Sequence, residues 1–99
     1  MLHDPRDETK IRARAVLNEA ADYIEAHGWC QHALKFRGRV CLLGALQQAD
    51  CYPGTGPVTA EALWRLSQVT GAISLSAWND AKGRTREQVV EALRRAAHA

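Results

Sequence analysis

Six consecutive residues near the middle of the chain are apolar on every side: Cys41-Leu42-Leu43-Gly44-Ala45-Leu46. A helix without a polar face belongs in the interior of a domain rather than at its surface. Gly44 lowers helix propensity by about 1 kcal/mol relative to alanine, so its use there indicates close backbone packing. We therefore expect this segment to be the centre of the fold, enclosed on all sides by helices, with an inert Cys41 thiol.

A long amphipathic helix is predicted before this segment. Pro5 suits the first helical position, Asp4 can cap the helix, and Gly28 is a natural stop. Residues 1–4 are expected to form a loose N-terminus. The apolar residues that share one face of this helix are Ala13, Val16, Leu17, Ala20, Ala21 and Ile24.

Between this helix and the central segment, the pattern changes to that of a short β-hairpin. Residues 33–41 alternate in polarity, with Arg37-Gly38 at the turn. Two strands alone are only marginally stable, so the hairpin is expected to pack on helices. Its apolar members are Leu34, Phe36 and Val40, and its solvent-facing members are Lys35, Arg37 and Arg39.

The second half of the chain predicts two further helices joined by a short helical turn. A loop at 50–57 leads into a helix from about Pro57 to Val69, and Gly71 ends it. The short turn begins near Ser74, and the last helix opens with a capping box, Thr85-x-x-Gln88. The residues expected to face inward are Ala60, Leu63, Leu66 and Ser67, then Leu75 and Trp78, then Val89, Val90, Leu93, Ala96 and Ala97.

Length and composition fit one ordinary domain. The chain has 99 residues, of which 46% are hydrophobic and 24% charged. We expect residues 1–99 to form a single mainly α domain, in which four to five helices surround the central apolar helix and one small β-hairpin is added. No apolar run is long enough for a bilayer, the start lacks the layout of a secretory signal, and the three cysteines are an odd number. These features predict a cytoplasmic protein without a membrane partner or a disulfide framework.

Several short motifs carry a family resemblance. They are Trp29, the run RVCLLGAL at 39–46, Trp78-Asn79-Asp80, and Gly83-Arg84-Thr85 followed by Glu87 and Val89. With them, the chain resembles a family of small proteins of unknown function from actinobacteria and their phages. Members of that family commonly have glycine where this chain has His32, so any role of His32 would be particular to this protein. The resemblance implies the fold, the compartment and a phage or mobile-element origin (hence the host cytoplasm), but no activity.

The leading candidate for a contact surface is Trp78-Asn79-Asp80. An aromatic ring beside an amide and a carboxylate can form a recognition patch, although Asn and Asp at a helix end also bond to nearby backbone groups. The surroundings are basic, because no acidic residue occurs between Ala26 and Ala49, and Asp80 is expected to form an ion pair with Arg84. The candidate interaction patch comprises Trp29, Lys35, Arg37, Arg39, Trp78, Asn79, Asp80 and Arg84.

DNA binding is an alternative. The order of helix, glycine-containing turn and short helix between Ala62 and Leu93 is similar to a helix-turn-helix. Its reading residues would be Ser74, Ser76 and Asn79, and its phosphate contacts Lys82, Arg84 and Arg86. Against this function stands a formal net charge of only +2.

Cysteine and histidine raise two chemical alternatives. Cys30 as a nucleophile, with His32 as base and Asn79 or Asp80 as orienter, would have the residue types of a thiol enzyme, but a base two residues away on a strand points past its neighbour. Cys30, His32, Cys41 and Cys51 include metal-ligand types without the spacing of a zinc module. No cofactor, metal or small-molecule substrate is inferred. The residues favour a non-enzymatic protein that binds a protein partner or itself.

Overall fold

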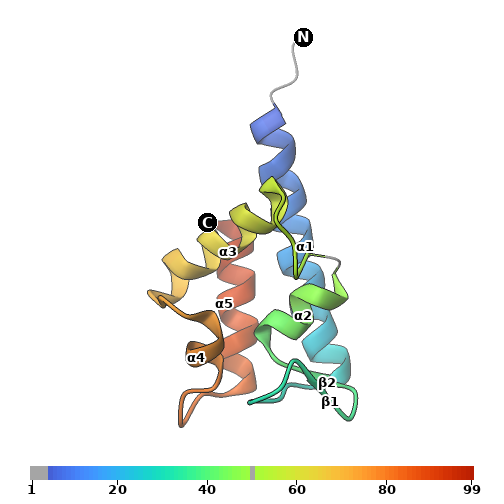
Figure 1. Cartoon of the computed structure of the whole chain (residues 1–99), viewed down its shortest axis with the longest axis vertical. Coiled ribbons are helices and arrows are strands. Elements are labelled where there is room, and N and C mark those ends of the chain that lie inside the picture. The colour runs from blue at the N-terminus through green and yellow to red at the C-terminus, as the bar shows by residue number, and fades with distance from the viewer. Residues whose placement is uncertain (1–4, 50) are drawn as a thin grey trace.

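The computed structural model describes residues 5–49 and 51–99, and Figure 1 shows how their elements are arranged. The helices are α1 (Pro5–His27), α2 (Leu42–Gln48), α3 (Pro57–Thr70), α4 (Leu75–Asn79) and α5 (Arg86–His98), and the strands are β1 (Lys35–Phe36) and β2 (Arg39–Val40). The prediction of a mainly α globule with one small hairpin is confirmed. The expected loose start at 1–4 and the Asp4 cap lie outside the described residues, as does Asp50.

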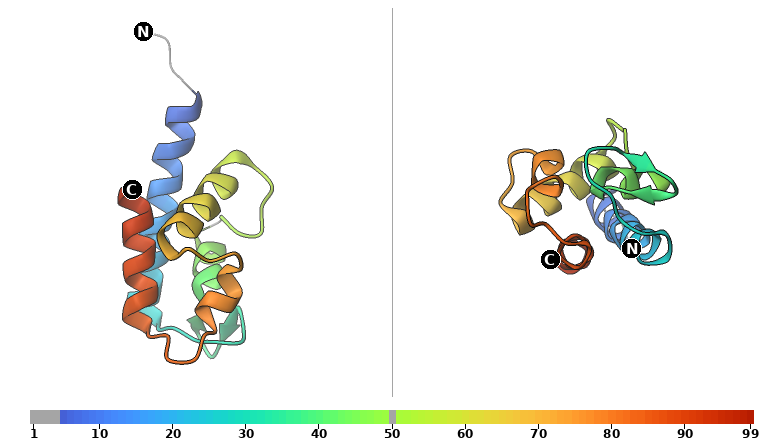
Figure 2. Two further views of the ribbon diagram at one scale, coloured as in Figure 1. Left: turned by 90° about the vertical axis from the view of Figure 1, so that its left-hand side faces the viewer. Right: turned by 90° about the horizontal axis from the view of Figure 1, so that it is seen from below.

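Two long helices form the frame. α1 and α5 run antiparallel along the longest axis, and α2, α3, α4 and the hairpin lie across one side of this pair (Figures 1 and 2). Every residue of α1 that its periodicity predicted to be inward is buried, and α5 begins with the predicted Thr85–Gln88 capping box. In α5, Val89, Leu93, Ala96 and Ala97 are buried as predicted, while Val90 is half-buried. The start of α1 projects beyond the other elements.

The predicted central segment forms α2, and most of it is buried. Leu42, Gly44, Ala45 and Leu46 face the interior, and a Cβ added at Gly44 would overlap the backbone carbonyl of Leu34. The close packing expected of Gly44 is therefore confirmed. Enclosure on all sides is wrong, because Leu43 is half-buried and faces outward. The reason is that α2 has only seven residues and packs mainly on α1, α4 and β2.

The inward face of α3 differs from the predicted one. Leu66 is buried as expected, but Ala60 is exposed and Leu63 and Ser67 are only half-buried. A buried arginine explains the rotation: Arg65 Nη1 donates to the carbonyl oxygens of Ala96 (3.1 Å) and Ala99 (2.7 Å), and its Nε donates to Glu61 (2.7 Å). The residues that α3 buries are Thr59, Ala62, Arg65 and Leu66.

The hairpin is antiparallel, with Lys35 opposite Val40 and Phe36 opposite Arg39. Arg37 (φ 52°) and Gly38 (φ 82°) both have the left-handed conformation that a two-residue hairpin turn requires, so the predicted turn is confirmed. Of its three apolar members, only Val40 is buried. Leu34 and Phe36 are 43% and 55% exposed.

None of the helices in residues 5–49 and 51–99 combines the length and hydropathy required to span a bilayer.

Candidate functional site

The side chain of Asn79 joins three segments of the chain. Its Oδ1 accepts hydrogen bonds from Trp29 Nε1 (2.7 Å) and from the backbone N–H of Leu42 (3.0 Å). Its Nδ2 donates to the carbonyl oxygen of Cys30 (3.2 Å) and to Asp80 Oδ1 (2.9 Å). Asn79 is 1% exposed. We call this network the Asn79 junction; it fixes the segment before the hairpin and the start of α2 to the end of α4, so Asn79 itself presents no surface to a partner.

On one side of the junction, Arg84 packs against Trp78. Its guanidinium carbon lies 3.9 Å from the centroid of the indole ring, and its Nε donates to the Trp78 carbonyl oxygen at 2.8 Å. The expected ion pair between Asp80 and Arg84 is wrong. Arg84 instead binds the backbone carbonyl of Trp78, in α4, and stacks on the indole ring of the same residue. Asp80 faces the segment that precedes the hairpin.

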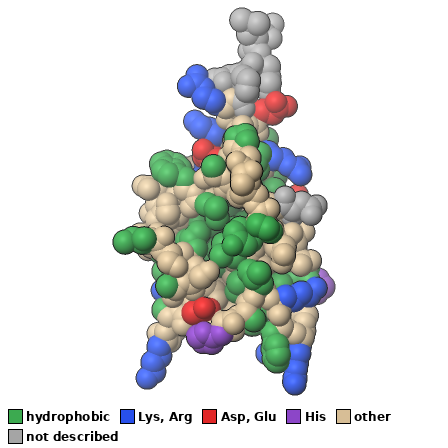
Figure 3. Space-filling view, viewed as in Figure 1, with side chains coloured by type: hydrophobic (Ala, Val, Ile, Leu, Met, Phe, Trp, Pro, Cys, Tyr) green, Lys and Arg blue, Asp and Glu red, His purple; other side chains and the backbone are tan. Residues whose placement is uncertain are grey.

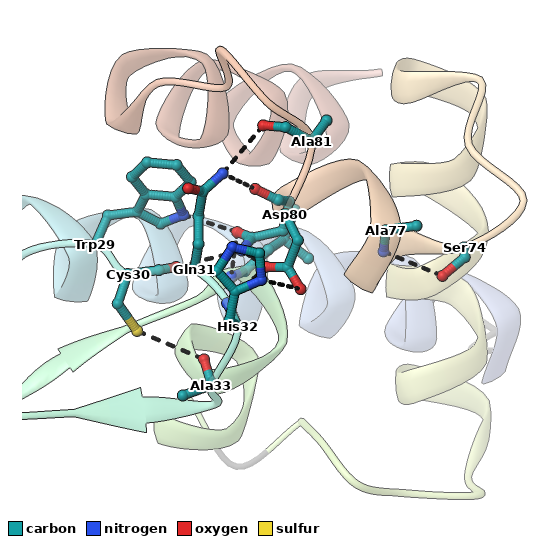
Figure 4. Close-up of polar contacts among 11 residues, drawn as sticks. Trp29, Cys30, Gln31, His32, Ala33, Ser74, Ala77, Asp80 and Ala81 are labelled. Atoms are coloured by element: carbon teal, nitrogen blue, oxygen red, sulfur yellow. Dashed lines mark hydrogen bonds and ion pairs between the residues drawn. The ribbon is translucent and has the colours of Figure 1, made fainter.

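That segment contains His32 and Gln31 (Figure 4). Asp80 Oδ1 accepts the backbone N–H of His32 at 2.9 Å, and Asp80 Oδ2 lies 3.7 Å from His32 Nδ1. Gln31 Nε2 donates to the carbonyl oxygens of Asn79 and Ala81, both at 3.1 Å. The hydrogen bond from the His32 backbone, followed by that from Asn79, lowers the pKa of Asp80. The junction thus holds Asp80 as a carboxylate.

His32 has a left-handed backbone, with φ of 68°. This conformation is uncommon for residues with a Cβ and natural for glycine. The Asp80 carboxylate accepts the backbone N–H of His32 in this conformation.

The three cysteines have different surroundings, and all are free thiols. Cys30 Sγ points to the hairpin carbonyls of Ala33 (3.5 Å) and Arg39 (3.6 Å), away from the imidazole of His32 (Figure 4). Burial, and after it the neighbouring Cys41, raises the pKa of the Cys30 thiol, and burial also raises that of Cys51. Across the described ranges, no thiol hydrogen-bonds to a histidine, and no three His, Cys, Asp or Glu side chains lie close enough together to hold a metal ion.

A hollow of about 220 Å³ opens beside the junction. His32, Asp80, Leu34, Cys41, Leu43 and Ser76 are among the residues that line it. Cys41 is among these lining residues, although it is buried as expected, with 8% of its surface exposed. Its Sγ accepts the backbone N–H of Gly44 at 3.3 Å and caps α2.

A second and more apolar hollow adjoins the first. It measures about 460 Å³ and shares Leu43 and Ser76 with it. Trp64 and Ile73 in its wall are 58% and 107% exposed. Figure 3 shows hydrophobic side chains gathered on this side of the molecule. We call this surface the apolar face; it consists of Leu34, Leu43, Tyr52, Trp64, Ile73 and Leu75.

The residues of the predicted interaction patch divide into two groups. The structure brings Trp29, Trp78, Asn79, Asp80 and Arg84 together at or beside the junction, and places Lys35, Arg37 and Arg39 exposed on the hairpin. Sequence reasoning missed the apolar face. One signal was present: Ile73 stands in a loop between Gly71 and the α4 cap Ser74, where no helix pattern requires an apolar side chain.

Similarity to known proteins identifies a family but adds no activity. Neither the curated proteins nor the solved structures include a match to this chain. A family described as being of unknown function matches residues 8–99, which is almost the whole length. The chain therefore belongs to that family of unknown function, DUF6197.

Proposed function

We propose that this protein is a non-enzymatic binding module that docks a partner protein on the apolar face. The observation that carries the proposal is the exposure of Trp64, Ile73 and Leu34 around two adjoining hollows. Single exposed apolar residues are ordinary, but a contiguous group of them around a depression is typical of a protein-binding surface. None of the three side chains is needed by the core, since each is at least 43% exposed.

Charge defines the partner further. The hairpin beside the first hollow carries Lys35, Arg37 and Arg39, and the residues from 27 to 49 contain no acid. The one carboxylate in the first hollow, Asp80, is occupied by donors from His32 and Asn79. A partner segment with apolar anchors and acidic flanking residues complements this surface, because opposite charges at the rim speed association and fix the register.

The Asn79 junction supports the surface rather than touching the partner. It fixes α4, which carries Leu75, to α2, which carries Leu43. A rigid surface loses less conformational freedom on binding than a mobile one, and more of the contact energy therefore appears as affinity. This gives Trp78-Asn79-Asp80 a role in binding that is indirect.

The geometry favours protein binding over DNA binding and over a thiol enzyme. α4, the reading helix of the hypothetical helix-turn-helix, has five residues and a length of only about 7.5 Å. Asn79 on it is buried, and the Ser74 hydroxyl accepts the N–H of Ala77. A thiol enzyme would require a base within hydrogen-bond reach of its nucleophile, and Cys30 points to hairpin carbonyls instead.

We place this activity in the bacterial cytoplasm, or in that of the host if the protein is phage-encoded. Three free thiols suit a reducing compartment. The resemblance to phage and actinobacterial proteins supports a bacterial host partner.

Site-specific photo-crosslinking tests the proposal. A benzoylphenylalanine introduced at Ile73, in the apolar face, should trap one partner from bacterial lysate under ultraviolet light. The same group at Ile11, which is 62% exposed on α1 and lines neither hollow, is the matched control and should not trap it. Trapping that is equal at the two positions would contradict the proposal. If sedimentation shows that the purified protein forms a dimer that depends on Ile73, the partner on the apolar face is a second copy of this chain.

A further inference from the structure

The first hollow, beside the Asn79 junction, is lined by two kinds of side chain. Leu34, which is 43% exposed, and half-buried Leu43 give it apolar surface, while Asp80 and His32 give it polar atoms. Its volume is about 220 Å³. An apolar cavity of about 150 Å³ inside a protein is large enough to hold benzene. The hollow therefore has room for one aromatic side chain of a partner.

One oxygen atom of Asp80 has no hydrogen bond. Oδ1 accepts both the backbone N–H of His32 and the side-chain amide of Asn79, each at 2.9 Å. Oδ2 lies 3.7 Å from His32 Nδ1, which is too far for a hydrogen bond. Among the residues that the structure describes, none donates to Oδ2. Because the Asp80 side chain is 31% exposed, a ligand in the hollow can reach this oxygen.

The same contacts decide the charge on this oxygen. The hydrogen bonds from the His32 backbone and from Asn79 lower the pKa of Asp80, so the side chain is a carboxylate at neutral pH. A carboxylate oxygen accepts hydrogen bonds that are shorter and stronger than those between neutral groups. The hollow therefore offers a strong acceptor next to apolar walls, and it suits a side chain that is apolar along its length with a donor at its tip.

The surroundings favour a neutral donor over a cation. Lys35, Arg37 and Arg39 lie on the adjacent hairpin, and residues 27–49 contain no acid, so a lysine or arginine of the partner would meet like charges. The hydroxyl of tyrosine is neutral at pH 7, since its pKa is about 10. Phenylalanine would cover the carboxylate without donating to it, which costs free energy. Tyrosine meets both requirements, and it is enriched among the residues that dominate protein interfaces.

We propose that the first hollow is a pocket for one tyrosine of the partner, whose ring packs on Leu34 and Leu43 and whose hydroxyl donates to Asp80 Oδ2. The inference rests on the proposed docking function and deepens it, because it names the side chain that the apolar face selects.

Nuclear magnetic resonance titrations of the labelled protein test the pocket with small probes. N-acetyltyrosinamide should shift the amide signals of His32, Leu43 and Ser76, which line the hollow, and bind about tenfold more tightly than N-acetylphenylalaninamide. The O-methyl ether of the tyrosine probe fills the same space but cannot donate, so it should bind no better than the phenylalanine probe.

Two variants locate the acceptor. Asp80→Asn retains an oxygen for the donors of His32 and Asn79 but removes the charged Oδ2, so the tenfold preference for tyrosine should fall to about threefold or less. Glu19→Gln removes one carboxylate from the exposed side of α1, away from both hollows, and should keep the full preference. Dispersed amide signals of each variant show that it is folded.

Three results would overturn the assignment. Equal affinities for the tyrosine and phenylalanine probes would remove the role of Asp80, and so would a preference that survives Asp80→Asn. Tighter binding of N-acetyllysinamide would identify a pocket for a cation. Crosslinking at Ile73 is judged separately: a trapped partner without any preference for tyrosine rejects the pocket alone, whereas a preference for tyrosine with equal trapping at Ile73 and Ile11 supports the pocket and rejects the docking of a protein.

Discussion

Replacing Asn79 with alanine should destabilise the fold far more than an ordinary change at a helix end. The substitution leaves two donors without acceptors: the backbone N–H of buried Leu42 and the indole N–H of half-buried Trp29. A stranded buried donor costs about 1–3 kcal/mol. Leu42 is fully buried and Trp29 partly so, which gives a total of about 4 kcal/mol for the pair. For a domain of this size, that loss lowers the melting temperature by at least about 15 °C.

Urea unfolding, followed by circular dichroism, measures this loss directly. Ser76→Ala, on the exposed side of the same helix, is the matched control and should change the free energy of unfolding by less than about 0.5 kcal/mol. In a Trp29→Phe background, Asn79→Ala should cost about 1 kcal/mol less, because the indole donor is no longer there to be stranded. An Asn79→Ala protein that melts within a few degrees of the wild type, yet loses its partner, would refute the reasoning and make Asn79 a contact residue.

Three further changes test other parts of the fold. Gly44→Ala should cost more than about 2 kcal/mol of unfolding free energy despite alanine's better helix propensity, because its Cβ overlaps the Leu34 carbonyl; a neutral result in urea unfolding would disprove that close approach. Arg65→Met should cost about 2 kcal/mol through the lost bonds to the carbonyls at the end of α5, and a more stable variant by calorimetry would contradict this role. The pKa of Asp80 is lowered by folding, so its contribution to stability is present above the ordinary carboxyl pKa of about 3.9 and is lost as pH falls through the lower folded value. Urea midpoints should therefore fall less between about pH 5 and pH 2 in Asp80→Asn than in the wild type; identical pH profiles would count against the His32 and Asn79 contacts.

The residues that could be predicted from sequence are those whose signal is local. The periodicity of α1 and the Thr85–Gln88 capping box are patterns among residues that lie within one or two helical turns of one another. Both predictions are confirmed. The rotation of α3 could not be predicted, because the carbonyl partners of the buried Arg65 lie 31 and 34 residues away in the sequence. Sequence patterning assumes that a charged side chain is exposed, whereas here carbonyl oxygens at the C-terminal end of α5 accept hydrogen bonds from the buried guanidinium.

The candidate site divides in the same way. Trp78-Asn79-Asp80 stood out by residue type, but the partner of Asn79, the indole of Trp29, is 50 residues distant in sequence. No local spacing encodes that contact. The apolar face also depends on packing, because Leu43 belongs to an apolar segment and yet is only half-buried. An apolar segment in the sequence predicts a buried helix. How much of a short helix is buried depends on the elements that pack around it in the fold.

Titration of the captured partner against two isoleucine variants tests the docking surface most directly. Full burial of an isoleucine side chain contributes about 1.5–3 kcal/mol. Ile73→Asp should therefore raise the dissociation constant at least tenfold. Ile11→Asp, the same substitution on α1, should leave the dissociation constant within twofold of the wild-type value. Equal affinities for Ile73→Asp and the wild type would contradict docking on the apolar face.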